Sequence, residues 1–263
     1  MKEDVLISFK NVNKQFQTEE GPSTVLKNIN FEVKRGSFTI IYGPSGSGKS
    51  TLLNVLVGLE RPTSGIVEVD GVDIYALTAD ERARYRANTI GMVYQSNNWV
   101  ASLSAIENIA LPLYLTGRSR GEALGEAKLS LQRVGLDKYA NYRPTILSGG
   151  QQQRISLARA TVVSPTLLIA DEPTGNLDTK NGDMVMNLLT QFRDDFNSTI
   201  VLVTHNLEYL PLSDHRISIK DGVVTQDEGQ YQTASNTLKK LQTQVSSMAS
   251  TSKSTTVKRK RRV

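Results

Sequence analysis

The first third of the chain carries the hydrophobic pattern of β-strands. Between Ile29 and Lys34 apolar and polar side chains alternate, as in a strand with one buried face. Phe38 to Tyr42 is a short continuous apolar run, which is typical of a strand covered on both faces. Val67 and Val69 precede Asp70-Gly71, a dipeptide suited to a tight hairpin turn. The pattern therefore predicts several strands before about residue 75.

The middle of the chain, from about residue 79 to 134, has a helical pattern. Ala123, Ala127 and Leu131 recur at the spacing of one helix face. Three residues that disfavour helix are expected to interrupt it: Pro112, Gly117 and Gly121. We therefore predict a helical subdomain with mobile joints.

After Gln151, predicted helices and strands alternate. A helix from Gln151 to Val163 precedes the apolar run Thr166 to Ala170, and a helix ending near Phe196 precedes Thr199 to Val203. Such alternation predicts an α/β fold with a mainly parallel sheet and helices on its faces. Asp221-Gly222 then marks a closing hairpin between Ile217 and Thr225.

Charge is distributed unevenly along the 263 residues. From Tyr231 onward there are eight Lys or Arg and no Asp or Glu, so this segment has a charge of +8. Because the whole chain has a net charge of +5, residues 1–230 have a net charge of −3. The body is therefore not a basic surface, and nucleic acid is not an expected partner. Residues 230–263 are polar and rich in Ser and Thr, and we expect them to form a disordered tail.

Several classes of protein are excluded by composition. The absence of Cys excludes a disulfide scaffold, a thiolate zinc site and a cysteine nucleophile. The longest apolar runs are far shorter than the roughly 18–20 residues that span a bilayer, and the N-terminus lacks a secretory apolar stretch. We therefore expect a cytoplasmic protein.

A glycine-rich turn joins the apolar run ending at Tyr42 to a predicted helix from Lys49 to Val57. It matches the pattern G-x-x-x-x-G-K-[ST] in the required strand–turn–helix context. Glycines allow consecutive N–H groups to surround phosphate at a helix N-terminus. Lys49 is expected to charge-pair with phosphates and Ser50 to ligate Mg²⁺. The predicted phosphate-binding residues are Gly43, Pro44, Ser45, Gly46, Ser47, Gly48, Lys49, Ser50 and Thr51.

Two carboxylates follow the buried run Leu167 to Ala170. Asp171 falls at the carboxyl end of this predicted strand, where ligands of open α/β sheets collect, and is placed to hold Mg²⁺ directly or through water. Glu172 is suited to act as general base toward an attacking water.

A further segment separates these two sites, and it points to a family. Its residues are Leu147, Ser148, Gly149, Gly150 and Gln151, followed by a predicted helix. With this segment the chain resembles the nucleotide-binding subunits of ATP-binding cassette (ABC) transporters over about residues 5–225. The resemblance implies an ABC-type P-loop ATPase domain at 1–229, with an antiparallel β lobe and a helical subdomain at about 96–160. It also implies Mg²⁺-dependent hydrolysis of ATP to ADP and phosphate.

The resemblance implies roles for residues outside the phosphate-binding turn. Phe16 matches an aromatic residue that stacks on adenine, with a core-facing Phe as the alternative. Gln95 matches a glutamine that contacts Mg²⁺ and the attacking water, and His205 matches a histidine that contacts the γ-phosphate. Asn176, Leu177 and Asp178 match a loop that crosses to the opposing subunit. His215 has no counterpart and is expected to be structural or solvated.

Partners also follow from the resemblance. ATP would lie between the glycine-rich turn of one subunit and residues 147–151 of another, which implies a C2 homodimer with two ATP sites. Residues 58–65, 106–112 and 171–178 resemble the branch of macrolide-export, lipoprotein-release and cell-division ATPases. That branch implies a peripheral subunit on the cytoplasmic side of the membrane. It pairs with a separate permease that carries a large extracytoplasmic domain, for export or mechanical transmission.

Some alternatives stay open at this point. The chain could be a soluble ABC-type ATPase that acts on a non-membrane partner such as a ribosome or DNA, or an ATP-binding module without turnover. Trp99 could contact the permease or pack inside the helical subdomain. The basic tail could be a solvated terminus, could adsorb to anionic lipid, or could bind nucleic acid. The transported substrate, the direction of transport and the identity of the permease are not encoded in these motifs.

Overall fold

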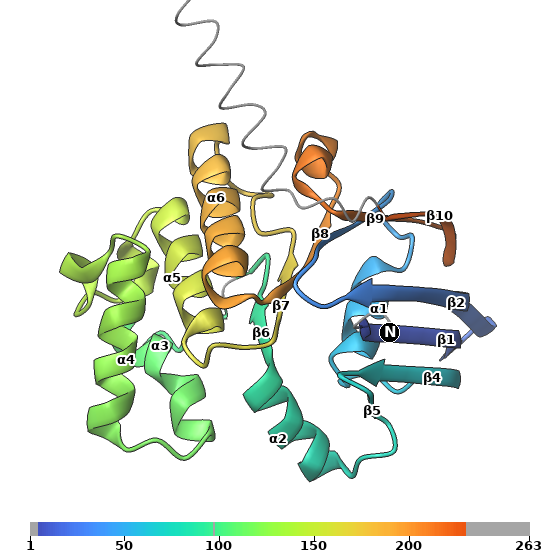
Figure 1. Ribbon diagram of the computed structural model, residues 1–263, viewed down its shortest axis with the longest axis horizontal. Coiled ribbons are helices and arrows are strands. Elements are labelled where there is room, and N and C mark those ends of the chain that lie inside the picture. The colour runs from blue at the N-terminus through green and yellow to red at the C-terminus, as the bar shows by residue number, and fades with distance from the viewer. Residues whose placement is uncertain (1–4, 97, 230–263) are drawn as a thin grey trace, which may run out of the picture.

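The computed structural model describes residues 5–96 and 98–229 and consists of two β-sheets with helices packed around them (Figure 1). The predicted tail, residues 230–263, lies outside the described residues. The longer helices are α1 (Lys49–Leu56), α2 (Ala79–Thr89), α3 (Ala105–Leu115), α4 (Arg120–Arg133), α5 (Gly149–Thr161) and α6 (Thr179–Phe196). Short 3₁₀ helices are η1 (Asp137–Tyr139), η2 (Pro144–Ile146) and η3 (Leu207–Leu212).

The larger sheet has six strands, all parallel except at one edge. Its order is β10-β9-β3-β8-β7-β6, and β10 alone runs antiparallel to its neighbour. The strands are β3 (Phe38–Tyr42), β6 (Ile90–Val93), β7 (Leu167–Asp171), β8 (Thr199–Thr204), β9 (His215–Lys220) and β10 (Val223–Gly229). The mainly parallel α/β sheet predicted from the sequence is confirmed, as is its closing hairpin at residues 221–222.

The smaller sheet is antiparallel and has the order β2-β1-β4-β5. Its strands are β1 (Val5–Thr18), β2 (Gly21–Lys34), β4 (Ser64–Val69) and β5 (Val72–Asp73). Asp70 and Gly71, which join the last two strands, both have positive φ, as the predicted tight turn requires. This sheet is the antiparallel lobe implied by the family resemblance.

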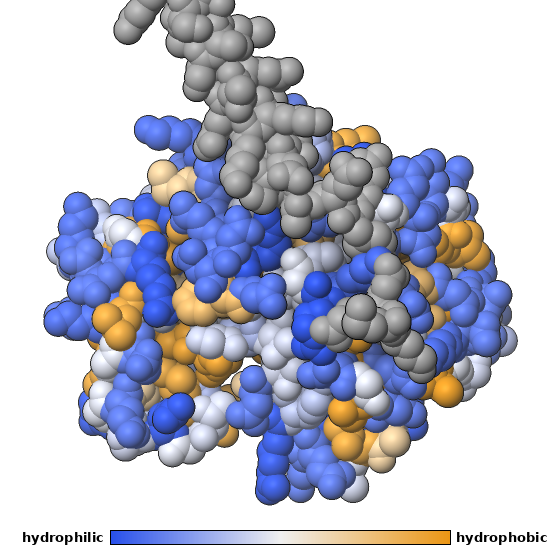
Figure 2. All heavy atoms as spheres, in the orientation of Figure 1, coloured by the Kyte–Doolittle hydropathy of each residue, from blue (hydrophilic) through white to orange (hydrophobic). Residues whose placement is uncertain are grey.

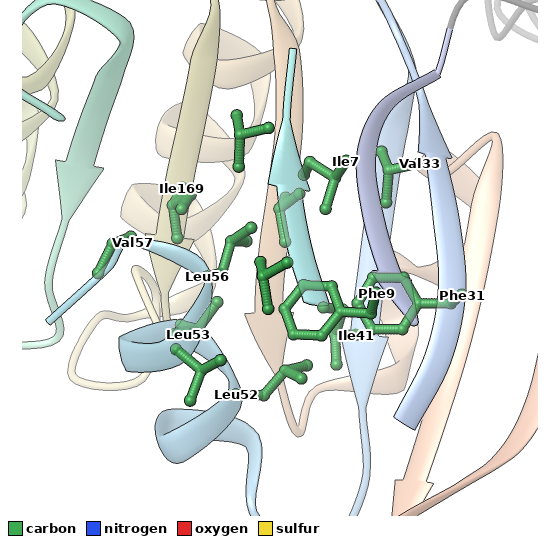
Figure 3. Close-up of a cluster of buried hydrophobic side chains, with 14 of the residues drawn as sticks. Ile7, Phe9, Phe31, Val33, Ile41, Leu52, Leu53, Leu56, Val57 and Ile169 are labelled. Carbon is green, nitrogen blue, oxygen red and sulfur yellow. The ribbon is translucent and has the colours of Figure 1, made fainter. Parts of the chain in front are cut away.

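Helix α1 is buried between the two sheets. Its Leu52, Leu53 and Leu56 face the aromatic and branched side chains of the smaller sheet, including Phe9 stacked on Phe31 (Figure 3). Because both sheets bury apolar side chains against α1, the turn that precedes α1 is held between them. A second cluster packs α5 and α6 on the other face of the larger sheet, and a third joins α3, α4 and α5.

The helical region differs from the sequence prediction in two respects. Strand β6 separates α2 from α3, so the helical pattern is not continuous after residue 79. Of the three expected interruptions, only Gly117 lies between helices. Pro112 lies in the last turn of α3 and Gly121 in the first turn of α4. Gly121 lies in the first turn of α4, where the N–H groups have no intrahelical partner to lose. Pro112 lacks the N–H that would bond four residues back, so α3 continues past it with one hydrogen bond fewer and does not end there.

The outer surface is mostly polar. On the face seen in Figure 2, hydrophilic residues cover most of the described body, and hydrophobic residues gather in small separate groups. Within the residues that the structure describes, no helix is both long enough and apolar enough to span a bilayer.

Candidate nucleotide-binding site

The turn between β3 and α1 has a backbone that only glycine accommodates at several positions. Gly46 and Gly48 have φ of +77° and +103°, in the left-handed region. A Cβ on Gly43 would lie 2.0 Å from the carbonyl oxygen of Ile219, and one on Gly48 would lie 3.1 Å from that of Val25. The turn is therefore confined between β9 and β2 and leads directly into the N-terminus of α1.

Lys49 extends back over this turn. Its side chain is buried, with the residue only 9% exposed, and its Nζ donates to the carbonyl oxygens of Gly43 at 2.8 Å and Pro44 at 2.9 Å. The buried Oγ of Ser47 has no hydrogen-bond partner among the described residues. A buried ammonium and an unpartnered hydroxyl at the N-terminus of a helix are the chemistry of an anion site.

A cavity of about 630 Å³ opens beside the turn. Its residues come from β2, from the turn, from α1 and from the carboxyl ends of β6, β7 and β8: Val25, Ser45, Gly46, Gly48, Lys49, Ser50, Thr51, Gln95, Asp171, Glu172 and His205. Parallel strands that end together at one edge of a sheet create such a site. The structure thus brings Lys49, Ser50, Gln95, Asp171, Glu172 and His205 together around one cavity.

Three residues hold Glu172 in place: Val203 and Thr204, which belong to β8, and His205, which follows that strand. Its N–H donates to the carbonyl oxygen of Val203 at 2.9 Å, and its Oε2 accepts a hydrogen bond from Thr204 Oγ1 at 3.3 Å. Oε1 lies 2.8 Å from His205 Nδ1. The φ of Glu172 is +46°, which is unfavourable for a residue with a side chain and is found at sites where the surroundings impose it. Sequence reasoning missed the contribution of Thr204.

The Asp171 carboxylate ends β7 and is partly buried. Burial raises the pKa of this carboxyl above its ordinary value, and the neighbouring charge of Glu172 raises it further, while Lys49 acts in the opposite direction. The folded protein therefore carries an unfavourable pair of negative charges that a bound cation would relieve.

Replacing Asp171 by Asn is expected to stabilise the nucleotide-free protein while impairing its chemistry. We expect a rise in Tm of about 2–4 °C at neutral pH, the size typical of relieving functional-site strain in a domain of this length. Because the folded-state pKa of Asp171 is raised, the gain should shrink as pH falls through that pKa, where the parent carboxyl takes up a proton. Thermal unfolding of both proteins across this pH range measures the effect. A lower Tm for the variant at neutral pH would contradict it.

Phe16 lies on β1 and is partly exposed, so it is not one of the buried core residues. This excludes the core-facing alternative. The ring does not line the cavity that contains Lys49, and the ammonium of Lys14 lies 4.7 Å from its centroid. Its stacking on adenine stays a prediction.

Ser148 caps the N-terminus of α5. Its hydroxyl accepts from the N–H of Gln151, whose side chain accepts from the N–H of Ser148, so α5 begins two residues before the predicted start. A Cβ on Gly150 would lie 2.4 Å from Asn181 Oδ1, whereas one on Gly149 would have only ordinary contact with Leu177. Leu147, Ser148, Gly149, Gly150 and Gln151 all lie outside the lining of the cavity.

The loop containing Asn176, Leu177 and Asp178 leads into α6. Asp178 caps this helix: its Oδ1 accepts from the N–H of Asn181 and its Oδ2 from Asn181 Nδ2, both at 2.8 Å. These hydrogen bonds lower the pKa of the Asp178 carboxyl. Asn181 therefore connects this loop to Gly150. Sequence reasoning missed this residue, whose only signal is its place three residues after the capping Asp178.

Trp99 packs within the helical subdomain. It is half-buried against the α3–α4–α5 cluster, and its Nε1 donates to Gln152 Oε1 at 3.0 Å. The guanidinium of Arg159 lies 4.6 Å from the ring centroid. This supports the packing alternative for Trp99. His215 is also internal: it is buried, with its Nε2 against Asp227, as expected for a structural histidine.

Comparison with known proteins gives one consistent relationship. A family model described as ABC transporter matches residues 26–175. The lipoprotein-releasing system ATP-binding protein LolD of Shewanella denitrificans is 38% identical over 223 residues, which are 85% of this chain and 96% of that protein. The ABC transporter ATP-binding protein MJ0796 of Methanocaldococcus jannaschii is 40% identical over 229 residues, 85% of this chain and 97% of that protein.

Two further matches extend the relationship. The macrolide export ATP-binding/permease protein MacB of Mannheimia succiniciproducens is 40% identical over 222 residues, 84% of this chain but only 34% of that longer protein. The dimeric, post-hydrolysis structure of MJ0796 bound to ADP and Pi has a TM-score of 0.80 and 38% identity. That match covers 86% of this chain and 99% of the MJ0796 chain.

Proposed function

The chain belongs to the ABC transporter family as an ATP-binding and ATP-hydrolysing subunit, and from this premise we propose that it closes as a homodimer around two ATP molecules and drives a separate membrane permease. One observation carries this proposal. The residues suited to phosphate, metal and water chemistry surround one cavity, whereas residues 147–151 lie outside it in the same chain. A second copy of the chain is the natural source of the missing half of the site.

Within one subunit the phosphates bind to the turn formed by residues 43–51. The N–H groups of the turn and the positive end of α1 face the phosphate oxygens, and Lys49 shifts its ammonium from the carbonyl oxygens of Gly43 and Pro44 to the anion. Phe16 stacks on the base. This division lets the two sheets bind opposite ends of the nucleotide.

Glu172 takes the proton of the attacking water. His205 and Thr204 orient its carboxylate, and Gln95, on the loop after β6, lines the same cavity and positions the water. His205 is exposed, so its imidazole is free to turn toward the γ-phosphate while Thr204 keeps hold of Glu172.

The residues present fit a magnesium ion. No group of three or more His, Cys, Asp or Glu side chains within 5–96 and 98–229 could enclose a metal by itself. Mg²⁺ binds through one or two protein oxygens together with phosphate oxygens and water, and Ser50, Gln95 and Asp171 offer such oxygens at the cavity. When bound there, the ion would neutralise charge developing on the phosphates. Burial, and after it the charge of Glu172, raise the pKa of Asp171 although Lys49 lowers it, so a bound cation would favour the ionised carboxylate.

A second subunit contributes its Ser148, Gly149 and Gly150 to the γ-phosphate. In each chain the hydroxyl of Ser148 is engaged in its own helix cap, so the N-terminus of α5 is already formed before another subunit meets it. The dimeric state of MJ0796 supports this arrangement. The same closing motion is what a coupled permease would receive.

The membrane partner is a separate chain, and the names of LolD and MacB support one of the lipoprotein-release or macrolide-export type. We place the subunit peripherally at the cytoplasmic face of the membrane, with a permease that has a large extracytoplasmic domain. The tail at 230–263 contributes contact with anionic lipid, since each Lys or Arg near such a surface adds about 1 kcal/mol.

One experiment on the purified full chain tests this proposal. We expect ATP hydrolysis that requires Mg²⁺ and falls to background when EDTA removes the metal. In a second arm, the full chain should sediment with anionic liposomes at low salt more than a chain ending at Gly229, with neutral liposomes as control. Metal-independent hydrolysis would contradict the site proposal, and equal sedimentation of the two chains would contradict the role of the tail.

A further inference from the structure

We propose that Lys14 is a positioning residue for the nucleotide base, because it holds the ring of Phe16 in the orientation that accepts an adenine. The inference rests on the proposed role of Phe16 and extends it to a residue that does not line the cavity. Lys14 and Phe16 lie two residues apart on β1, and the ammonium of Lys14 is 4.7 Å from the centroid of the Phe16 ring. A cation at this distance is attracted to the face of the ring.

Lys14 is fixed before any nucleotide arrives. Its residue is only 9% exposed, and its Nζ donates to Glu60 Oε1 at 2.5 Å and to the carbonyl oxygen of Arg61 at 2.9 Å. A buried ammonium with these two partners has little freedom to leave the ring, since an unpaired charge in that position would be costly. Lys14 is therefore a rigid support.

The anchor connects the two parts of the nucleotide site. Glu60 and Arg61 lie just after α1, the helix whose N-terminus follows the phosphate-binding turn. Lys14 thereby ties β1, which carries Phe16, to the segment that leaves α1. This connection sets the position of the ring relative to the turn that binds the phosphates.

The cation also decides which face of Phe16 is used. With the ammonium over one face of the ring, a planar base would stack on the opposite face. The cation draws electron density from the ring, which favours stacking with an electron-rich purine on that face. Phe16 offers no hydroxyl, so the support from Lys14 substitutes for the hydrogen bond by which a tyrosine could be oriented.

Comparison of ADP with inorganic pyrophosphate separates the base from the phosphates. Calorimetric titration of the full-length Lys14→Met variant should show about fivefold weaker binding of ADP. Its pyrophosphate affinity should match that of the parent protein. Lys14→Arg, which keeps a cation over the ring, should bind ADP within about twofold of the parent protein. The matched control is Lys10→Met on the same strand, where the lysine is exposed and pairs with Glu68 at 2.6 Å; its affinities for both ligands should be those of the parent.

A double mutant assigns the effect to the ring. In a Phe16→Ala background, which should itself weaken ADP binding, Lys14→Met should cause no further loss. Three results would overturn the inference: equal weakening of ADP and pyrophosphate, an additive loss in the double mutant, or unchanged ADP affinity in Lys14→Met while Phe16→Ala binds ADP weakly. Unchanged ADP affinity in Phe16→Ala is a different failure, because it removes the proposed stacking role of Phe16 itself.

Discussion

A Glu172→Gln variant is expected to hydrolyse ATP at least about 100-fold more slowly than the parent while still binding it. The substitution preserves the length and shape of the side chain, so the contacts from Thr204 and His205 keep a partner. The amide cannot accept the proton of the attacking water at neutral pH, so the loss falls on kcat. The left-handed backbone at this position is equally unfavourable for Gln, which leaves the folding cost unchanged.

Steady-state hydrolysis and equilibrium binding of ATP together measure this effect. The matched control is Glu208→Gln, the same substitution on η3, where the side chain is exposed and does not line the cavity. It should retain the parent rate. If Glu172→Gln turned over ATP as fast as the parent, another group would have to accept the proton. If its ATP affinity fell as far as its rate, Glu172 would instead act through binding.

The phosphate-binding half of the site was accessible from sequence because its signals are local. The turn from Gly43 to Thr51 lies between an apolar strand and a helix, and Asp171 closes a second apolar strand, so strand order alone brings them to one sheet edge. The helix boundaries also had local signals. Ser104 with Glu107 and Ser119 with Glu122 form capping boxes that mark where α3 and α4 begin.

Other features depend on contacts between distant residues, which spacing along the chain does not reveal. The Trp99 indole donates a hydrogen bond to Gln152, and the Lys14 ammonium donates one to Glu60. Pro112 was expected to interrupt a helix, and its actual position depends on where α3 ends. The separation of Gly149 from the cavity is also a three-dimensional fact, and it is the one with the greatest consequence for mechanism.

Two inactive variants are expected to restore activity when mixed, if each ATP site is built from two chains. Lys49→Met removes the phosphate-binding cation. Gly149→Asp places a carboxylate where the partner's ATP would lie, and the chain tolerates it, because a Cβ there meets only Leu177 at 3.6 Å and an acidic residue suits the first turn of α5. Each variant alone should retain less than about 1% of the parent rate, since each removes one central interaction with the phosphates from both sites of its dimer.

In an equimolar mixture half of the dimers contain one copy of each variant. Such a dimer has one site with both defects and one site with none, so with independent sites the mixture should reach about a quarter of the parent rate. Lys49→Met mixed with Glu172→Gln is the control. Lys49 and Glu172 belong to the same half of the site and come from the same chain. Every site in a mixed dimer therefore keeps one defect, and no activity should return. Subunit exchange is verified by co-purification of two differently tagged copies in the presence of ATP. With exchange verified, an inactive first mixture would contradict the shared site, because residues 147–151 would then serve the ATP of their own chain or none.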